Sequence, residues 1–341
     1  MQDEKREIRS LTPEELESAL GSLGEPAYRA GQVFSWLGKG VSSFEEMTNL
    51  PAPLREKLGE HFILSAPVLL RKQVSSQDGT VKYLWGLRDG NAVECVVMHY
   101  SYGSTVCISS QVGCRQGCVF CASTGLGFRR NLSAGEMLEE VIFSGLDSGT
   151  KLTGVVLMGI GEPLENYDEV LRFLRLVNHP RGLNIGMRHI SLSTCGLVPE
   201  IRRLAEERLQ LTLSVSLHAP EDETRRKLMP VAAKYDLETL MDCCADYFRR
   251  TERRISFEYA LIRGVNDAPR QAERLAGLMR RTHGHVNLIP LNRVEGSPLV
   301  PGDTRKFAGL LREKGVNVTV RRRLGADIDA ACGQLRRKEA T

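Results

Sequence analysis

Three cysteines in one short segment are the strongest chemical signal in this sequence. Cys114, Cys118 and Cys121 lie in GCRQGCVFCAS, residues 113–123, with three and then two residues between successive cysteines. Thiolates this close together act as metal ligands, and zinc sites and iron–sulfur clusters are typically held by four protein ligands. The segment offers no fourth cysteine or histidine, which disfavours zinc. It favours an iron–sulfur cluster with one iron open to another molecule.

Segments with strand periodicity flank these cysteines and would position them. Apolar residues alternate in PVLLRKQVSS, TVKYLWGL, AVECVVMHY and STVCISS, and the last of these leads into the cysteine segment. Further along, apolar runs alternate with stretches of helical length, in GVVLMG, HISLST, LQLTLSVSL, RISFEYALI, HVNLIPL and NVTVRR. This alternation predicts parallel strands with crossover helices, and about six such units favour a partial (βα)6 barrel in the α/β class. The cysteines would then lie at the carboxyl end of a strand, where active sites of such sheets are found.

Helix signals mark the remaining elements and suggest a division into domains. Residues 11–60 read as short helices, beginning at a Thr-Pro-Glu-Glu start, and Ser133 with Glu136 forms a capping box before the first barrel helix. The predicted domains are an N-terminal helical accessory domain for RNA recognition (1–65), a linking β-strand extension (66–100), the barrel core (101–332) and a basic C-terminal tail (333–341).

Composition narrows the cellular setting of the protein. The N-terminus is too charged for a signal peptide, and no apolar run approaches the roughly 20 residues of a membrane span, so we expect a cytoplasmic protein. Nine cysteines in that compartment indicate metal binding or catalysis rather than a disulfide framework. The net charge of +4 is mild, and clustered arginines alone are only a weak indication of RNA binding.

Several motifs along the whole chain resemble one known family. The cysteine spacing, with the aromatic Phe120 before the last cysteine, resembles the radical S-adenosylmethionine (SAM) superfamily. Together with VLMGIGEPL (156–164), SLSTCG, SVSLHAP, NLIPLN, DIDAACGQL, QVGC and FRRNLS, it resembles the RlmN/Cfr family of RNA methylases. That family methylates adenosine at carbon 2 or carbon 8. The resemblance implies a radical SAM barrel, one [4Fe–4S] cluster held by Cys114, Cys118 and Cys121, and two SAM molecules per turnover.

The resemblance also implies a set of SAM-binding residues at successive strand ends. A lone buried histidine such as His218 is ordinarily a packing residue, but its place in a matched motif favours a binding role. We interpret Cys195, Cys95, Cys243 and Cys244 as packing residues. The implied SAM-binding residues are Gly161 and Glu162 at the methionine amino end, Ser193, then Ser216, Leu217 and His218 on the ribose and carboxylate side, and Asn292 at the adenine.

Three further residues receive catalytic roles from the resemblance. Carbon 2 of adenine offers no nucleophile to a polar methyl transfer, so the family uses a radical. Cys332 would first accept a methyl group from SAM as S-methylcysteine. A radical derived from a second SAM would activate this methyl group, which then bonds to the base. Release of the covalent protein–RNA adduct would need Glu94 as proton acceptor and Cys107, which forms a transient disulfide with Cys332.

Two branches of the family and one protein of another class remain as alternatives. Pro163 after Gly161-Glu162 favours carbon-2 methylation of 23S rRNA, and also of the tRNA adenosine 3′ of the anticodon. The first alternative is a Cfr-type carbon-8 methylase that confers antibiotic resistance. The second is a non-catalytic RNA-binding protein with a structural metal. The expected partners are 23S rRNA, tRNA and an electron donor such as flavodoxin, and we expect a monomer with no membrane partner.

Overall fold

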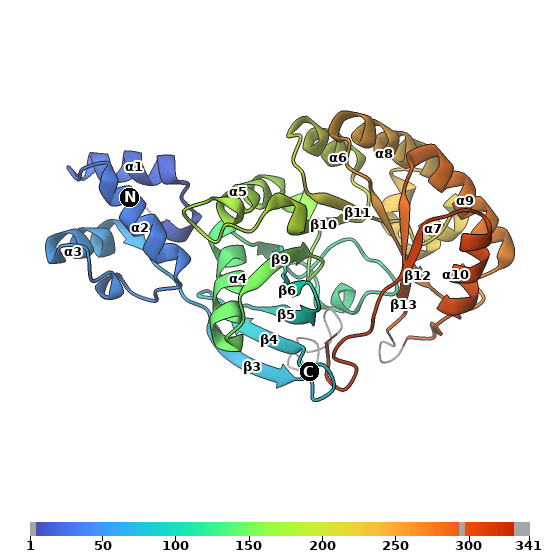
Figure 1. Cartoon of the computed structure of the whole chain (residues 1–341), viewed down its shortest axis with the longest axis horizontal. Helices are drawn as coiled ribbons and strands as arrows, with labels where there is room; N and C mark the ends of the chain where they lie inside the picture. Colours follow the sequence, from blue (N-terminus) through green and yellow to red (C-terminus); the bar gives the residue numbers. More distant parts are fainter. Residues whose placement is uncertain (1–4, 293–296, 331–341) are drawn as a thin grey trace.

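One curved ten-stranded sheet organises the molecule, with strand order β14-β13-β12-β11-β10-β9-β6-β5-β4-β3 (Figure 1). The computed structural model describes residues 5–292 and 297–330 of the chain. The strands of this sheet are β3 (Val68–Val74), β4 (Val81–Gly86), β5 (Ala92–Tyr100), β6 (Gly103–Cys107), β9 (Leu152–Leu157), β10 (Ile190–Thr194), β11 (Thr212–Ser216), β12 (Ser256–Leu261), β13 (His285–Pro290) and β14 (Val318–Val320).

Parallel strands joined by helices form the larger part of the sheet. Strand β6 pairs in parallel with β9, and each later strand up to β14 pairs in parallel with the one before it. Each of the six connections between these strands contains a helix, so the predicted partial (βα)6 barrel is confirmed. The helices are α4 (Ala134–Ser148), α5 (Tyr167–Asn178), α6 (Val198–Glu206), α7 (Asp222–Leu228), α8 (Leu237–Thr251), α9 (Pro269–Thr282) and α10 (Thr304–Glu313).

Helix α5 illustrates how the sequence builds the outer layer of the barrel. Its buried residues include Val170, Leu171, Leu174 and Val177, which recur at the helical spacing of three and four residues. This apolar face packs on the sheet, and each such side chain contributes about 1.5–3 kcal/mol when it leaves water. The predicted capping box of α4 is also present, because the backbone N–H of Glu136 donates to the Ser133 hydroxyl at 3.1 Å.

Strands β3, β4 and β5 continue the barrel sheet in antiparallel order. Strand β5 pairs with β6, so that Val96 lies opposite Cys107, and β4 is buried along its whole length. Strand β3 forms the far edge. Residues 325–330, here called the C-terminal strap, reach this edge, since the side chains of Gln73 and Asp329 hydrogen bond at 3.1 Å and Ser75 donates to Asp327 at 2.6 Å.

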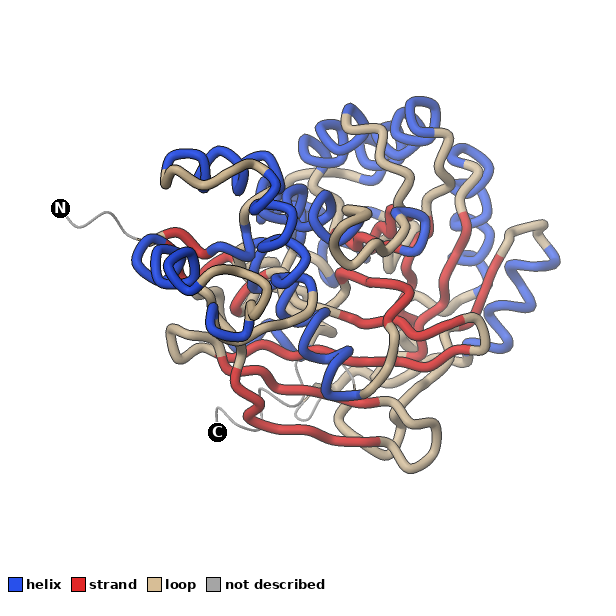
Figure 2. Tube along the Cα trace, turned by 60° about the vertical axis from the view of Figure 1, so that its left-hand side comes forward, coloured by secondary structure: helices blue, strands red, loops and turns tan. Residues whose placement is uncertain are grey.

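The N-terminal helices lie together at one end of the molecule in both Figure 1 and Figure 2. Buried Arg9 attaches them to the barrel by an ion pair with Glu139 of α4 at 3.2 Å, and burial raises the pKa of Glu139 to about 7. The role of these helices in RNA recognition and the division into domains stay predictions. The elements here are β1 (Arg6–Glu7), α1 (Pro13–Ser22), α2 (Tyr28–Gly38), α3 (Ala52–His61) and β2 (Phe62–Ile63), with 3-10 helices at Ile8–Ser10 and Phe44–Glu46.

None of the helices within residues 5–292 and 297–330 is both long enough and apolar enough to cross a bilayer.

Candidate active site

A cavity of about 260 Å³ lies at the carboxyl ends of the parallel strands. We call it the loop cavity, because the segment that carries the three cysteines forms one of its walls. Glu258 and Met158 contribute side chains from the barrel interior. The structure therefore brings together residues that lie far apart in the sequence. Of the predicted site residues, the loop cavity is lined by Cys114, Cys118, Cys121, Gly161, Glu162, Ser193, Ser216, His218 and Asn292.

The cysteine loop, residues 113–129, is closed at its base by a short hairpin. Strand β7 (Gln111–Val112) pairs with β8 (Arg130–Asn131) in antiparallel fashion. At the neck, Gly113 has φ +81°, and a Cβ atom there would lie 1.6 Å from the carbonyl oxygen of Gly127. Only glycine fits this close approach of two backbone segments. The neck thus fixes where the loop leaves the sheet and returns to it.

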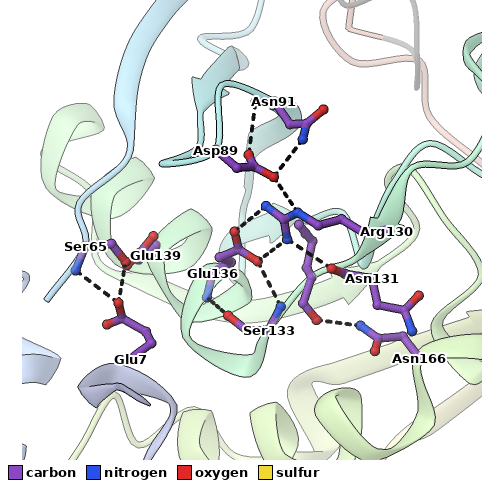
Figure 3. Close-up of polar contacts among 11 residues, drawn as sticks. Glu7, Ser65, Asp89, Asn91, Arg130, Asn131, Ser133, Glu136, Glu139 and Asn166 are labelled. Carbon is purple, nitrogen blue, oxygen red and sulfur yellow. Dashed lines mark hydrogen bonds and ion pairs between the residues drawn. The ribbon is translucent and has the colours of Figure 1, made fainter. Parts of the chain in front are cut away.

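Arg130 fastens the hairpin to its surroundings, as Figure 3 shows. Its Nε donates to Asp89 at 2.6 Å, and its two Nη atoms donate to the two carboxylate oxygens of Glu136 at 2.8 and 2.7 Å. Asn166 adds a second attachment, since its amide donates to the carbonyls of Ser110 at 2.9 Å and Leu132 at 2.7 Å. Bidentate pairing of arginine with carboxylate is rigid as well as strong. Both ends of the cysteine loop are therefore held.

The three thiols share the loop cavity and influence one another. Burial, followed by smaller contributions from neighbouring thiols and carboxylates, raises the pKa of Cys114 and of Cys118 to about 12. Within the described ranges, no three His, Cys, Asp or Glu side chains are placed closely enough to hold a metal ion as they stand. A thiol must lose its proton to become a metal ligand, and the raised pKa values make this loss unfavourable when no cation is bound. Binding of a positively charged cluster would offset this cost, so three thiols that line one cavity fit a thiolate-ligated cluster.

Two adjacent residues after β9 shape the floor of the loop cavity. Gly161 has φ +113°, and a Cβ atom there would lie 2.7 Å from the side chain of Gln111. The Glu162 carboxylate accepts hydrogen bonds from the backbone N–H of Cys195 at 2.7 Å and of Leu164 at 3.0 Å. Burial raises the pKa of Glu162. Its carboxylate therefore ties the ends of β9 and β10 together, and its predicted contact with the methionine amino group stays a prediction.

His218 is held in one orientation and one protonation state. It has φ +55°, which non-glycine residues rarely adopt and which is common at functional sites. Its Nδ1 accepts the backbone N–H of Ala260 at 2.9 Å, so the proton of the neutral ring is on Nε2. Burial, and then the charge of Arg225, lower the pKa of His218 to about 3. The ring also meets Phe120 edge-on at 4.5 Å, so it offers the cavity a neutral N–H donor.

Arg225 is a site residue that the sequence did not reveal. It lies fully buried beneath the loop cavity, where its Nη2 donates to the carbonyl of Cys195 at 2.8 Å and its Nη1 to that of Tyr235 at 3.3 Å. In the sequence it belongs to DETRRKL, a helix whose charges look like an exposed face. Cys195, which we interpreted as a packing residue, also lines the loop cavity, and its thiol lies 3.2 Å from Gln116 Oε1.

The predicted SAM-binding role of Leu217 stays a prediction. Its side chain is fully buried in the hydrophobic core and does not line the loop cavity, whereas Ser216 and His218 on either side of it do. The reason is the alternation of side chains at a strand end, which sends every second residue to the opposite face.

A second cavity, of about 440 Å³, adjoins the first and is lined by Cys107. The two cavities share Met158, Ile289, Asn292 and Arg321. We call it the Cys107 cavity. Its walls also include Val96 and Met98 of β5, and residues of the C-terminal strap as far as Ala330.

Two of the three predicted catalytic residues fall in the described part of the chain. Cys107 lines the Cys107 cavity, and its thiol is not in a disulfide with any described cysteine. Glu94 lines neither cavity and is buried beside them, paired with Lys82. Cys332 lies outside the described residues; the described chain ends at Ala330, two residues earlier in the sequence. The predicted disulfide between Cys107 and Cys332 therefore stays a prediction.

We expect Glu162→Gln to destabilise the protein by about 2 kcal/mol. Each carboxylate oxygen of Glu162 accepts one backbone hydrogen bond, whereas a glutamine amide has a single, uncharged acceptor oxygen. SAM binding should weaken as well, since the ends of β9 and β10 line the loop cavity. Urea unfolding and equilibrium dialysis with SAM would measure the two effects. Glu165→Gln is the matched control: its ion pair with half-exposed Arg115 spans 3.5 Å and contributes at most about 1 kcal/mol. Equal effects of the two substitutions would contradict this role of Glu162.

Comparisons with known proteins match the whole chain. Residues 108–276 match the family model of the radical SAM superfamily, and residues 7–64 match the ribosomal RNA large subunit methyltransferase N-terminal domain. A protein of Alkaliphilus oremlandii described as "Probable dual-specificity RNA methyltransferase RlmN" is 50% identical over 98% of both chains. A protein of the same description from Pelotomaculum thermopropionicum is 54% identical over 98% of this chain and 92% of its own.

A solved structure agrees with these relatives. The crystal structure of a radical SAM methyltransferase from Sphaerobacter thermophilus superimposes with a TM-score of 0.91 at 43% sequence identity. The alignment covers 96% of this chain and 98% of that one, so the likeness includes both the N-terminal helices and the barrel.

Proposed function

The chain belongs to the RlmN family of radical SAM RNA methyltransferases, and from this premise we propose that it methylates carbon 2 of adenosine in 23S rRNA and tRNA. The observation that carries the proposal is the loop cavity, which gathers the three cysteines and all the predicted SAM-binding residues except Leu217 in a chain that aligns with an RlmN relative over 98% of its residues. The family uses one [4Fe–4S] cluster and SAM, two molecules per cycle. Proline at position 163, which begins the 3-10 helix Pro163–Asn166 and lines the loop cavity, favours carbon 2.

In this proposal Cys114, Cys118 and Cys121 hold the cluster, and Ser193, Ser216, His218 and Asn292 bind SAM beside it. When bound, the cluster supplies the electron that cleaves SAM and so provides a carbon radical. The protein contributes orientation: the Nε2–H of His218 donates a hydrogen bond, and the fixed strand ends hold the methionine and adenosine parts apart. The largely apolar walls contributed by Leu157, Met158, Ile289 and Leu291 keep water away from reactive species.

The Cys107 cavity would receive the target adenosine. It adjoins the loop cavity, so a base there lies next to SAM, and buried Thr80 lines it with a hydroxyl that has no hydrogen-bond partner among the described residues. Cys332 would carry the methyl group to the base, the adduct radical would return one electron to the cluster, and Glu94 would accept the proton lost from carbon 2. The Cys107 thiolate would then attack the Cys332 sulfur, so that the S–S bond forms as the C–S bond breaks, and the released carbon would take up a proton to become the methyl group of the base.

RNA is the substrate class that the family acts on, and the remaining partners belong to the proposal. We include tRNA beside 23S rRNA because relatives with 98% coverage of this chain are described as dual-specificity enzymes. The proposal also includes a flavodoxin-like electron donor, a monomeric state and a cytoplasmic location.

Mass spectrometry of nucleosides tests the position of methylation. Expression of this chain in cells that lack their own enzyme should yield 2-methyladenosine in 23S rRNA and tRNA. A Cys118→Ala chain is the matched control and should yield none. Detection of 8-methyladenosine would instead establish the Cfr-type reaction. No methylated adenosine, together with zinc in the purified protein, would favour the non-catalytic RNA-binding alternative.

A further inference from the structure

We propose that Lys82 is a positioning residue for the reaction, which holds the Glu94 carboxylate charged and in place beside the Cys107 cavity. This inference rests on the proposed function, because it takes Glu94 as the proton acceptor. Lys82 Nζ lies 2.6 Å from Glu94 Oε2. The two side chains are 0% and 2% exposed, so water screens their attraction very little.

A buried pair of this kind requires an explanation other than stability. Lysine is almost never fully buried unless it is paired, and Lys82 is the second residue of β4, which is the second strand from the sheet edge. Removing both charges from water costs several kcal/mol, and apolar residues of similar volume are often as stable. A general base must be ionised before it can accept a proton, and a paired lysine would keep a buried carboxylate in that form. This function would explain why the pair is present.

The register of the strands places the pair at the wall of the Cys107 cavity. Lys82 follows Thr80 by two residues, and Glu94 precedes Val96 by two, so each shares a face of the sheet with a residue that lines the cavity. Val96 lies opposite Cys107 on β6. The Glu94 carboxylate is therefore one side-chain row from the thiol that would resolve the adduct.

The polar and titratable groups around the pair come from β3, the C-terminal strap, β6 and α4. On β3, Gln73 lies opposite Lys82 and Arg71 lies opposite Leu84. The strap reaches the same place, because Asp329 hydrogen bonds with Gln73. On β6 the nearest titratable group of the cavity is Cys107. Across the sheet, Glu140 of α4 accepts the Ser109 backbone N–H at 3.0 Å.

The test is Lys82→Met in the full-length, cluster-loaded enzyme. Iron content, cleavage of SAM and methylation of Cys332 should match the parent. Turnover should fall on the order of 100-fold, since general base catalysis contributes 10²–10⁴-fold, and the covalent protein–RNA adduct should accumulate. Lys82→Arg should resolve the adduct almost normally. Adduct that resolves at the parental rate in Lys82→Met would overturn the proposal.

Comparison with Glu94→Gln separates this inference from the proposed function. If Glu94→Gln accumulates adduct and Lys82→Met does not, the role of Lys82 is wrong and that of Glu94 stands. If neither variant accumulates it, the proton-acceptor assignment itself fails. Should Lys82→Met not fold, Lys82→Gln replaces it, since glutamine still donates a hydrogen bond to the carboxylate and removes only the charge. A Lys82→Gln enzyme with parental kinetics would likewise reject the proposal.

Discussion

Replacing Cys118 with alanine should remove the iron–sulfur cluster and abolish methyl transfer to RNA. Cys118 lines the loop cavity together with the other two thiols of the cysteine loop, and an alanine there leaves two sulfur ligands where the cluster needs three. After anaerobic reconstitution the parent should contain about four iron and four sulfide per chain, and the variant almost none. Elemental analysis, the brown absorbance of the cluster and methylation of a 23S rRNA fragment would measure the result.

Cys195→Ala is the matched control for this experiment. Cys195 lines the same cavity, so the structure offers a fourth thiol that a closed four-cysteine site would use. Its thiol contacts Gln116 instead, and the Glu162 carboxylate binds its backbone N–H. We therefore expect Cys195→Ala to retain iron and substantial activity. Loss of iron in both variants would show that the site is closed by four thiolates, which leaves no iron open to SAM.

Replacing Cys107 with alanine should trap the enzyme on its RNA. Methyl transfer to Cys332 and bonding to the base do not need the Cys107 thiol, whereas release of the base does, because a thioether leaves as a disulfide only when a second thiol attacks it. Turnover should stop after one cycle. A denaturing gel of the variant purified from cells should show a slow-migrating species that ribonuclease removes.

Cys95→Ala is the control here, because Cys95 lies on the neighbouring strand but faces the opposite side of the sheet. Its thiol lies 3.0 Å from the Ser144 hydroxyl of α4, and burial raises its pKa well above the usual range. This variant should turn over normally and form no adduct. A Cys107→Ala enzyme that gives normal methylated product without a nuclease-sensitive band would mean that Cys107 is only a packing residue.

The sequence predicted the elements of this fold because their signals are local. Strand and helix periodicity, the Ser133–Glu136 capping box and the spacing of the three cysteines each depend on residues a few positions apart. The order of parallel strands then places their carboxyl ends together, so most of the predicted SAM-binding residues meet in one cavity. The side chain of Leu217 does not line the cavity, because the pleat of the strand decides which side chains of a motif face it.

Lys82 and Arg225 show what sequence patterns leave out. Each occupies a position that alternation or helical periodicity assigns to a polar, exposed face. Each is nevertheless buried, and other elements supply its partners: Glu94 of β5 for Lys82, and the carbonyls of Cys195 and Tyr235 for Arg225. Periodicity states which residues share a face, and it does not state what lies against that face.

The ten-stranded sheet ends at β14 and β3, which do not pair with each other. A closed barrel would need a whole ladder of backbone hydrogen bonds to break before its interior opened sideways. Here the C-terminal strap reaches the β3 edge by separate side-chain contacts, such as Ser75 with Asp327 at 2.6 Å and the Gly325 N–H with Asp78 at 2.9 Å. In the proposed reaction the target nucleotide lies inside a long polymer and has no free end to thread, and separate contacts of this kind could open sideways with the hydrogen-bond ladder of the sheet intact.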